Sequence, residues 1–413
     1  MTELFHPRDP GVIENPYPMY HRLQDEDPVH RSDAFSTWVL TRYEHVQPML
    51  NDPRLSADRI SPYLDQLSPG EREKHATVGP LLQRWAVFMD PPDHTRMRKL
   101  MNQAFTSTAL AKMRPRVEAI VARMVDRLVD AGADGRDVDF IREFAFPLPA
   151  TVIAGMIGVP DSDLDRFQKW SEDLAPFVGS ALETLDKVGP AERSARALTE
   201  YFTGVIEARR ADPPAADDEA IIDLMIRAEE EGDTLDLAEL IANCVLLLFA
   251  GHETTTNLLA NGLMALMRNP DQMALFRGDP QGLAKSAVEE FLRYDGPIGG
   301  VARSVLAPVE LDGKTIPAGD RVFCMLNAAN RDPRRFDDPD RLDITRKKNQ
   351  HVIFGYGIHF CLGAPLARME GQIAFPLLLE RLRHIEPGAG EPKWTDSLVL
   401  RGVDSLPIRF RAA

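Results

Sequence analysis

The chain has 413 residues, of which 44% are hydrophobic and 27% are charged, the composition of a folded globular protein. Its net charge of −15 disfavours nucleic acid as a general partner, and three widely spaced cysteines disfavour a disulfide framework or a cysteine-rich zinc site. The N-terminus has neither an apolar signal core nor a basic leader, and the longest apolar run, Cys244 to Gly251, is far shorter than the roughly 20 residues that span a bilayer. We therefore expect a cytoplasmic protein that binds neither membrane nor nucleic acid.

The first sixty residues mix helical and strand-like patterns. A helix is expected over 18–25, a strand over 37–41 and a second short helix from Tyr43. From Pro92 onward, apolar residues recur every three to four positions, which is typical of amphipathic helices. These predicted helices span 95–104, 113–131, 141–157, 161–170 and 190–211.

A much longer helix is predicted from Asp236 to about Arg268. Asp236 and Glu239 have the spacing of an N-terminal capping pair, and Asn269-Pro270 ends the pattern. About thirty residues at about 1.5 Å each give a helix near 50 Å long, enough to cross a whole domain.

The second half of the chain adds short strands to the helices. Two helices over 271–278 and 282–294 precede strand-like segments at 300–304, 309–311, 314–316 and 320–326. Residues 327–360 form a turn-rich meander, a final helix begins near Ala364, and two short strand-like pieces follow. We predict one domain over 1–413, mainly α-helical with a small β portion. The β portion lies mostly within 1–60 and 300–410, and the helical part within 90–295 and 364–385.

The segment FAGHETTTNL, residues 249–258, lies near the middle of the long helix. Its His252-Glu253 pair resembles the start of the zinc-protease motif HExxH, but the position of the required second histidine is Thr256. A two-histidine zinc site therefore cannot form here.

The segment FGYGIHFCLG, residues 354–363, places three glycines around Cys361 directly before a predicted helix. Glycines allow a close backbone approach to a flat ligand, and a helix N-terminus favours a thiolate. Such a cysteine is a nucleophile, a metal ligand or, in the plainest interpretation, a buried residue in a glycine-rich turn. A lone thiolate on iron is one known form of haem ligation.

This segment resembles the haem-binding motif FxxGxHxCxG of the cytochrome P-450 family, matching at Phe354, Gly357, His359, Cys361 and Gly363. The resemblance implies haem b with Cys361 as its axial thiolate, Phe354 packed near the sulfur and His359 bonded to a haem propionate. Gly355 and Gly363 are included among the haem-contacting positions.

Three other segments match the family in order and spacing. Glu290 and Arg293 resemble its ExxR pair, and Pro339-Asp340-Arg341-Leu342 resembles the PERF element that supplies a partner arginine. In the family this cluster is structural and anchors the meander, so Glu290 and Arg293 are excluded from catalysis. His94, Arg98 and Arg303 resemble the residues that bind the haem propionates, a charge pairing that buried carboxylates require.

Within FAGHETTT, the resemblance is to the family motif (A/G)Gx(D/E)T on the helix that crosses the haem. Ala250 and Gly251 are small enough to admit dioxygen. Thr254 is expected to hydrogen-bond dioxygen or an ordered water, and Glu253 to relay protons from solvent. A threonine bonded back to its own helix is the plainer interpretation of Thr254.

By the same resemblance, a set of mostly apolar residues forms the substrate pocket, and together they favour a medium-to-large lipophilic substrate such as a polyketide, steroid or terpenoid. These residues are Leu82, Trp85, Val87, Phe88, Leu174, Phe177, Val178, Leu247, Ala250, Ile298, Gly299, Val301, Val399 and Leu400. Ordinary core residues have the same character, so core packing is the alternative for each of them.

The resemblance implies a bacterial monooxygenase that inserts one atom of O2 with electrons from a separate ferredoxin or flavodoxin and its reductase. The basic residues Arg96, Lys99, Arg346, Lys347 and Lys348 could attract such an acidic partner. The alternatives are a peroxide-dependent haem enzyme or isomerase, against which the Glu253-Thr254 pair argues, and a non-catalytic haem-thiolate sensor.

Overall fold

A computed structural model describes residues 4–133, 135–179, 187–215, 220–230 and 235–413. The chain is 58% helical with a small β part, which confirms the predicted fold class. It forms two compact units: the first comprises 1–55, 110–149 and 254–413, and the second comprises 56–109 and 150–253. The predicted organisation as a single domain stays a prediction.

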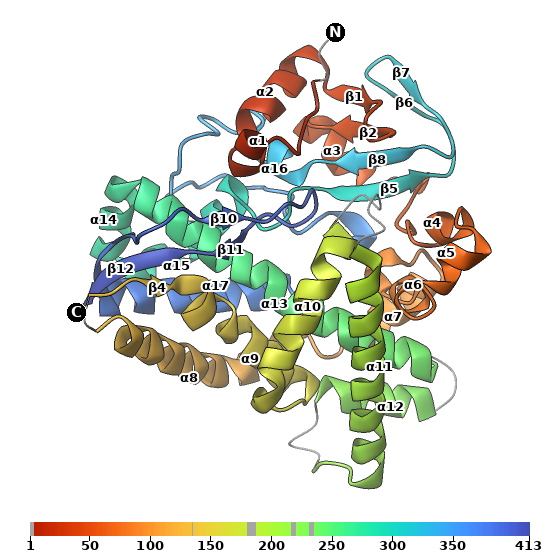
Figure 1. The fold of residues 1–413 in the computed structure, drawn as a ribbon. Helices are drawn as coiled ribbons and strands as arrows, with labels where there is room; N and C mark the ends of the chain where they lie inside the picture. The colour runs from red at the N-terminus through yellow and green to blue at the C-terminus, as the bar shows by residue number, and fades with distance from the viewer. Residues whose placement is uncertain (1–3, 134, 180–186, 216–219, 231–234) are drawn as a thin grey trace. The chain divides into compact units, whose positions relative to one another are not determined.

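The first unit carries the sheets. Its largest sheet has the strand order β1-β2-β8-β5-β3, in which β2 runs parallel to β8 and antiparallel to β1 (Figure 1). Smaller sheets pair β4-β12-β9, β10-β11 and β6-β7. The strands are β1 (Val29–Ser32), β2 (Thr37–Leu40), β3 (Leu55–Ser56), β4 (Val138–Asp139), β5 (Val301–Val305), β6 (Val309–Leu311), β7 (Lys314–Ile316), β8 (Arg321–Cys324), β9 (Leu382–Pro387), β10 (Lys393–Trp394), β11 (Val403–Ser405) and β12 (Pro407–Ala412).

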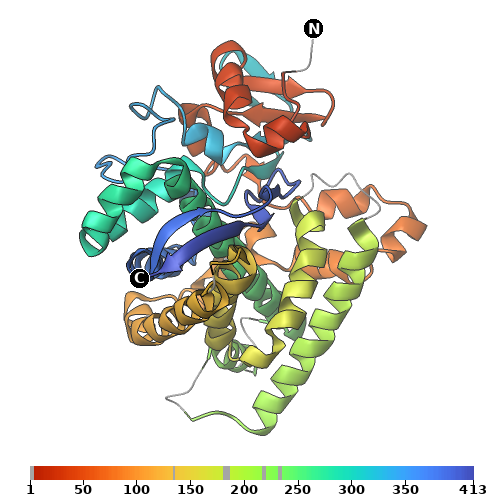
Figure 2. The ribbon, with the colours of Figure 1, turned by 60° about the vertical axis from the view of Figure 1, so that its left-hand side comes forward.

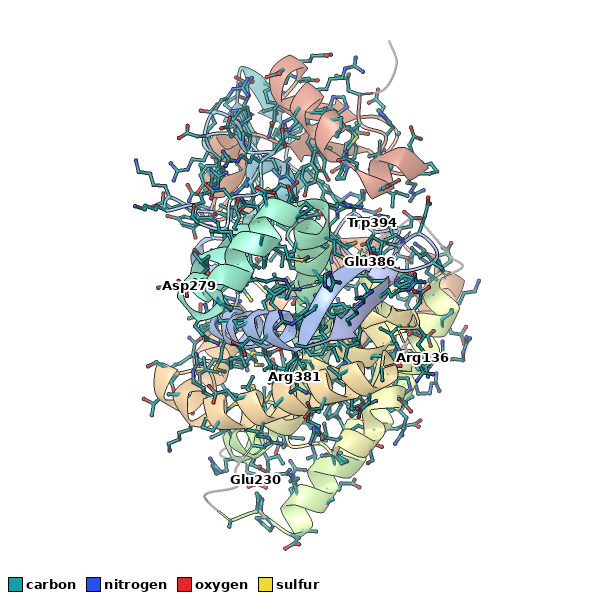
Figure 3. All side chains as sticks on the ribbon, turned by 90° about the vertical axis from the view of Figure 1, so that its left-hand side faces the viewer. Arg136, Glu230, Asp279, Arg381, Glu386 and Trp394 are labelled. Carbon is teal, nitrogen blue, oxygen red and sulfur yellow. The ribbon has the colours of Figure 1, made fainter. Side chains whose placement is uncertain are left out.

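The helices of the first unit come from the start of the chain, from residues 107–145 and from residue 270 onward. They are α1 (Pro10–Glu14), α2 (Tyr17–Glu26), α3 (Tyr43–Met49), most of α8 (Ser107–Ala131), η2 (Ile141–Ala145), α14 (Pro270–Gly278), α15 (Pro280–Tyr294), α16 (Leu326–Ala329), η6 (Gly357–His359) and α17 (Ala364–Arg381). Figure 3 labels Asp279, whose carboxylate caps α15 by accepting the Gly282 N–H at 2.9 Å, and Arg381 at the end of α17.

The second unit is helical. It contains α4 (Ser61–Asp65), α5 (Pro69–Glu73), α6 (Val78–Gln83), η1 (Ala86–Phe88), α7 (Asp93–Met101), most of α9 (Pro147–Ile157), η3 (Asp161–Asp163), α10 (Leu164–Gly179), α11 (Val188–Ala211) and α12 (Ile221–Glu230). Helices α10 and α11 run side by side, as Figure 2 shows.

The predicted long helix is α13 (Leu237–Arg268), with 32 residues. Its start is capped as expected, because the Glu239 N–H donates to Asp236 at 2.7 Å and the Asp236 N–H donates to Glu239 at 3.1 Å. By length and hydropathy alone α13 could cross a membrane, but 61% of its most apolar window is buried inside the structure. Buried core helices of soluble proteins have the same character, so this helix is weak evidence for a membrane span.

Candidate active site

The Cys361 segment forms a tight turn that presents the thiol at the start of α17. The Cys361 N–H donates to the Phe354 carbonyl at 2.8 Å, which closes the turn at its base. Gly355 and Gly357 adopt φ values of 74° and 73°, a left-handed conformation that favours glycine. A Cβ on Gly357 would also lie 1.9 Å from the Asn51 side chain, so this position admits no other residue without rearrangement.

Cys361 is the one cysteine of the three whose environment suits a thiolate. Burial raises the pKa of Cys324 to about 12 and the pKa of Cys244 still further above its usual value, so both remain neutral thiols. Cys361 is half-buried and lies two residues before Gly363, the N-cap of α17. The positive end of that helix favours a negative sulfur.

Phe354, on the other side of the turn, is fixed by a cation–π contact. The Arg368 guanidinium lies 4.5 Å from the centre of the Phe354 ring and donates to Glu289 at 2.6 Å. Glu289 also lies 3.1 Å from His351, and these two partners hold the pKa of Glu289 at about 2, even though burial opposes ionisation. The ring predicted to lie near the sulfur is thus held by a charged network that the sequence did not indicate.

One face of α13 is accessible near the middle of the helix, directly after a buried stretch. Residues 240–249 are all buried, but Ala250 is exposed and Gly251, Glu253 and Thr254 are half-exposed. Positions separated by three and four residues share one face of a helix. His252 is fully buried on another face, where its Nδ1 lies 2.7 Å from the Leu248 carbonyl. The acid, the alcohol and the small residues are therefore the members of this motif that an incoming ligand can reach.

The glycine of this motif has a packing role as well. A Cβ on Gly251 would lie 2.5 Å from Cγ1 of Ile153 on α9, so Gly251 allows α9 and α13 to pack closely. The predicted reason for a small residue, space for dioxygen, is thus accompanied by a second reason in the helix packing.

Three of the predicted propionate ligands lie on α7 and β5, and the fourth, His359, is the last residue of η6. On α7, His94 is 3% exposed, and burial together with the positive charge of Arg98 lowers the pKa of His94. Arg98 donates to Asn102 at 3.1 Å. On β5, Arg303 donates to the carbonyl of Ala302 at 2.9 Å. Two neighbouring basic side chains on α7 favour an anionic partner.

The residue types that each unit contributes fit a thiolate-ligated haem. Cys361, His359, Arg303 and Thr254 belong to the first unit, and His94, Arg98, Gly251 and Glu253 to the second. One accessible cysteine before a helix, basic side chains for two carboxylates and a small accessible helix face are the groups that such a haem requires. The role of each residue stays a prediction.

The ExxR pair lies at the centre of a buried network rather than on a surface. Both Glu290 and Arg293 are fully buried, and Arg293 donates to Glu290 at 2.8 and 2.9 Å. Arg293 also donates to the carbonyls of Asn330, Pro339 and Arg341, which anchors the meander as expected.

The arginine that completes this network is not the one expected. Arg346, rather than Arg341, donates to the Glu290 carboxylate at 3.1 Å. Arg341 contributes its backbone carbonyl to Arg293. The predicted PERF-like segment therefore supplies backbone acceptors, and the third charged side chain comes from five residues later.

This placement also changes the predicted electron-partner surface. The Arg346 side chain is only 11% exposed and is committed to Glu290. Arg96 is paired with Glu239 and Asp93, and the hydrogen bond to Glu239 raises the pKa of Arg96. Neither arginine presents the exposed charge that was expected, whereas Lys99, Lys347 and Lys348 are exposed.

The predicted substrate residues are divided between the two units. In the second unit, Trp85 stacks on Phe88 with ring centres 5.9 Å apart and contacts Phe249 at 5.5 Å. The Trp85 indole N–H is buried without a hydrogen-bond partner among the described residues. Leu82, Leu174, Phe177, Val178 and Leu247 are buried as well, and Val87 is 45% exposed.

In the first unit, two segments bring the remaining candidates together. Ile298 forms a β-bridge with Leu400, and the Gly299 N–H donates to the Val399 carbonyl at 2.8 Å. Val301, half-buried, opens β5 directly after this pairing.

Comparisons with known proteins show which proteins this chain resembles. A family model described as Cytochrome P450 matches residues 37–277 and 282–406. The chain is 41% identical over 409 residues to cytochrome P450 107B1 of Saccharopolyspora erythraea, covering 97% of this chain and 96% of that protein. It is 39% identical over 404 residues to the vitamin D(3) 25-hydroxylase of Pseudonocardia autotrophica, covering 96% and 94%.

A solved structure shares the fold along nearly the whole chain. The myxobacterial cytochrome P450 CYP267B1, crystallised with myristic acid, superposes with a TM-score of 0.86 at 37% identity, covering 99% of this chain and 98% of that one.

Proposed function

Because this chain belongs to the cytochrome P450 family, we propose that it oxygenates a medium-to-large lipophilic substrate with electrons from a separate ferredoxin or flavodoxin. It is a cytochrome P450 monooxygenase, an oxidoreductase that takes electrons from a redox partner and binds substrate with O2. The observation that supports the proposal most directly is the accessible Ala250, Gly251, Glu253 and Thr254 face within the buried α13.

Cys361 would hold the haem iron through its thiolate, and His94, Arg98, Arg303 and His359 would hold the two propionates. When bound, a thiolate-ligated haem supplies the reductive activation of dioxygen that oxygen insertion requires. The turn closed by Cys361 and Phe354 would keep the sulfur at the N-terminus of α17, where the helix dipole stabilises its negative charge.

Glu253 and Thr254 would control the protons. A carboxylic acid that is half-exposed can take up protons from solvent, and the neighbouring hydroxyl can pass them inward through hydrogen bonds. Ala250 and Gly251 leave this path unobstructed by side chains. Both residues of the pair are needed for the proposed cycle, because one exchanges with solvent and the other reaches the reacting oxygen.

The substrate class follows from the character of the two predicted contact groups. Their side chains are aromatic or aliphatic, and two relatives act on or bind lipophilic molecules: one is a vitamin D(3) hydroxylase and one was crystallised with myristic acid. A polyketide, steroid or terpenoid has the size and apolarity that fit such a pocket. A cytoplasmic location in a bacterium is part of the same proposal.

The experiment that tests this function compares electron sources. We expect the purified, haem-loaded protein to convert a bound lipophilic compound when it receives NADPH, a ferredoxin and a ferredoxin reductase, and to convert little with hydrogen peroxide alone. Equal conversion with peroxide would support a peroxide-dependent enzyme instead. Tight binding of many ligands with no product from any would support a sensor.

A further inference from the structure

Ile298 and Gly299 pair with Val399 and Leu400, which belong to a short turn over 397–400. Two backbone hydrogen bonds, from the Gly299 N–H to the Val399 carbonyl and from the Arg401 N–H to the Pro297 carbonyl, form the β-bridge that joins the two segments. Within the turn, the Val399 and Leu400 N–H groups donate to the Ser397 hydroxyl at 3.2 and 3.0 Å. A turn with so few ladder bonds needs other contacts to fix its position.

Arg401, the residue directly after this turn, supplies those contacts. Its backbone N–H donates to the Pro297 carbonyl at 2.8 Å and is one of the two hydrogen bonds of the bridge. Its guanidinium Nε donates to the Asp295 carboxylate at 3.0 Å, and the guanidinium lies 3.7 Å from the ring centre of Trp394, labelled in Figure 3. The Arg401 side chain thus contacts Asp295, just before one paired segment, and Trp394, just before the other.

The same guanidinium reaches the N-terminal segment. It donates to the carbonyls of Ile13 and Glu14, the second at 2.8 Å. Asp295 also accepts a hydrogen bond from the Tyr17 hydroxyl at 2.7 Å. A cavity of about 30 Å³ lies under the turn and is lined by Gly299 and Leu400 together with N-terminal residues that include Met19 and Tyr20. The N-terminal segment therefore lines the same cavity as the turn.

A second connection leads to the oxygen-site helix. The Asn261 side-chain amide on α13 donates to the Asp295 carbonyl at 3.0 Å and to the Arg401 carbonyl at 2.9 Å. Asn261 is 2% exposed and lies seven residues, about two helical turns, after Thr254. The base of the turn is thereby tied to the helix that carries the proposed proton donor.

We propose that Arg401 is a positioning residue for substrate selection, which holds the 397–400 turn against 297–299 through Asp295 and the N-terminal carbonyls. The inference rests on the proposed function, because it takes Val399 and Leu400 as substrate contacts. Arg401 itself touches no reacting group. Its removal changes where the turn lies and therefore which lipophilic molecule fits, while Cys361 and the proton path are unaffected.

The test uses the haem-loaded full chain with Arg401→Gln, the milder Arg401→Lys, and Arg209→Gln as a matched control. Arg209 likewise donates to a buried aspartate, Asp223, and to a backbone carbonyl, that of Gly158, but it lies in the other unit. The first readout is amide hydrogen exchange at Gly299, Val399 and Leu400. The second is the ratio of the dissociation constants for testosterone and myristic acid, with binding measured by the change in haem absorbance.

We expect faster exchange at these three amides in Arg401→Gln and a change of about fivefold in the ratio. Arg401→Lys retains a positive charge for Asp295 but lacks the planar guanidinium with its several N–H donors. Its exchange rates and its ratio of dissociation constants should therefore lie between those of Arg401→Gln and the wild type. Exchange equal to that of Arg209→Gln would overturn the inference, and so would an unchanged ratio with faster exchange. Failure of the wild type to bind either probe would instead contradict the proposed substrate class, and the exchange readout would still decide the positioning role.

Discussion

Glu290 places its carboxylate among donor groups from four residues, without any contact with solvent. Arg293 and Arg346 provide charged donors, and the Asp343 N–H and the Asn349 amide provide neutral ones at 2.9 and 3.1 Å. Removing the charge of a buried pair leaves the remaining guanidinium uncompensated. We expect Glu290→Gln to reduce the free energy of unfolding by about 3–5 kcal/mol and to weaken haem retention, as measured by denaturant unfolding and by the haem-to-protein absorbance ratio.

The control is Glu26→Gln, which removes the charge of an exposed pair with Arg22. Exposed pairs contribute less than about 1 kcal/mol, so this variant should resemble the wild type. Equal stability of Glu290→Gln and Glu26→Gln would show that the buried network does not anchor the meander.

Glu370 on α17 is the opposite case, a buried acid with an oxygen that lacks a partner among the described residues. It is 1% exposed, and burial raises its pKa to about 8 from an ordinary value of 4.5. The folded protein therefore keeps a proton there that the unfolded chain releases above about pH 4.5. Stability from this group is fully present below that pH and is lost as pH rises toward 8, by at most about 1.4 kcal/mol per pH unit.

We expect Glu370→Gln to remove this dependence, because glutamine does not titrate. The difference in unfolding free energy, variant minus wild type, should increase steadily from pH 5 to pH 8 in denaturant titrations. A difference that stays constant over this range would mean that Glu370 has an ordinary pKa.

At the scale of elements, the contact between α9 and α13 is set by Gly251. A methyl group there would overlap Ile153, whose Cγ1 lies 2.5 Å from the position of the added atom. We expect Gly251→Ala to destabilise the protein by about 1–3 kcal/mol, the usual cost of overpacking. In an Ile153→Ala background the same change should cost less, because Cγ1 and Cδ1 are gone and only Cβ, at 3.0 Å, still contacts the added methyl.

A double-mutant cycle in thermal or denaturant unfolding measures this coupling. If Gly251→Ala leaves stability unchanged and alters only product formation, the glycine serves the oxygen site alone and the packing role is wrong.

The elements that the sequence predicted best are those with their own local signals. The Asp236 and Glu239 cap and the Asn269-Pro270 stop place α13 within one residue at its start and at Arg268 at its end. Strand β1 (Val29–Ser32) was missed because VHRS has no apolar alternation, and it is defined by pairing with β2. Helices α4, α5 and α6 were missed because they have only five or six residues, too few for a helical period to show. Helix α12 was missed although it is as long as α2, which was predicted.

In the candidate site, too, residues with a local sequence signal could be predicted and residues defined by distant contacts could not. Cys361, Glu253 and Thr254 could be found from motifs because their spacing is local. The role of Arg346 could not, because its partner Glu290 is 56 residues away and the meander that carries Arg346 has little periodicity. The contact of Arg401 with Ile13 and Glu14 spans nearly the whole chain and has no local signal at all.

At the scale of the whole molecule, a net charge of −15 makes the exposed lysines near the Cys361 segment unusual. Lys347 and Lys348 would attract an acidic ferredoxin, and attraction of this kind acts mainly on the association rate. We expect Lys347→Glu with Lys348→Glu to slow reduction by ferredoxin about tenfold at low salt, in stopped-flow measurements, and to leave ligand affinity unchanged.

Lys112→Glu with Lys285→Glu, at exposed positions of α8 and α15, is the control because it makes the same change in total charge. Equal slowing by both substitutions would indicate a general charge effect, and no slowing by either would place the electron partner elsewhere.

The central claim is that Cys361 is the thiolate ligand of a haem in this cytochrome P450. The most direct test is the absorption spectrum of the reduced, carbon monoxide-treated protein. We predict a Soret band at the long-wavelength position that distinguishes ferrous haem with a thiolate ligand, and its loss in Cys361→Ser. A band at the shorter wavelength of haem with a neutral ligand, or no haem absorbance at all, would contradict the claim.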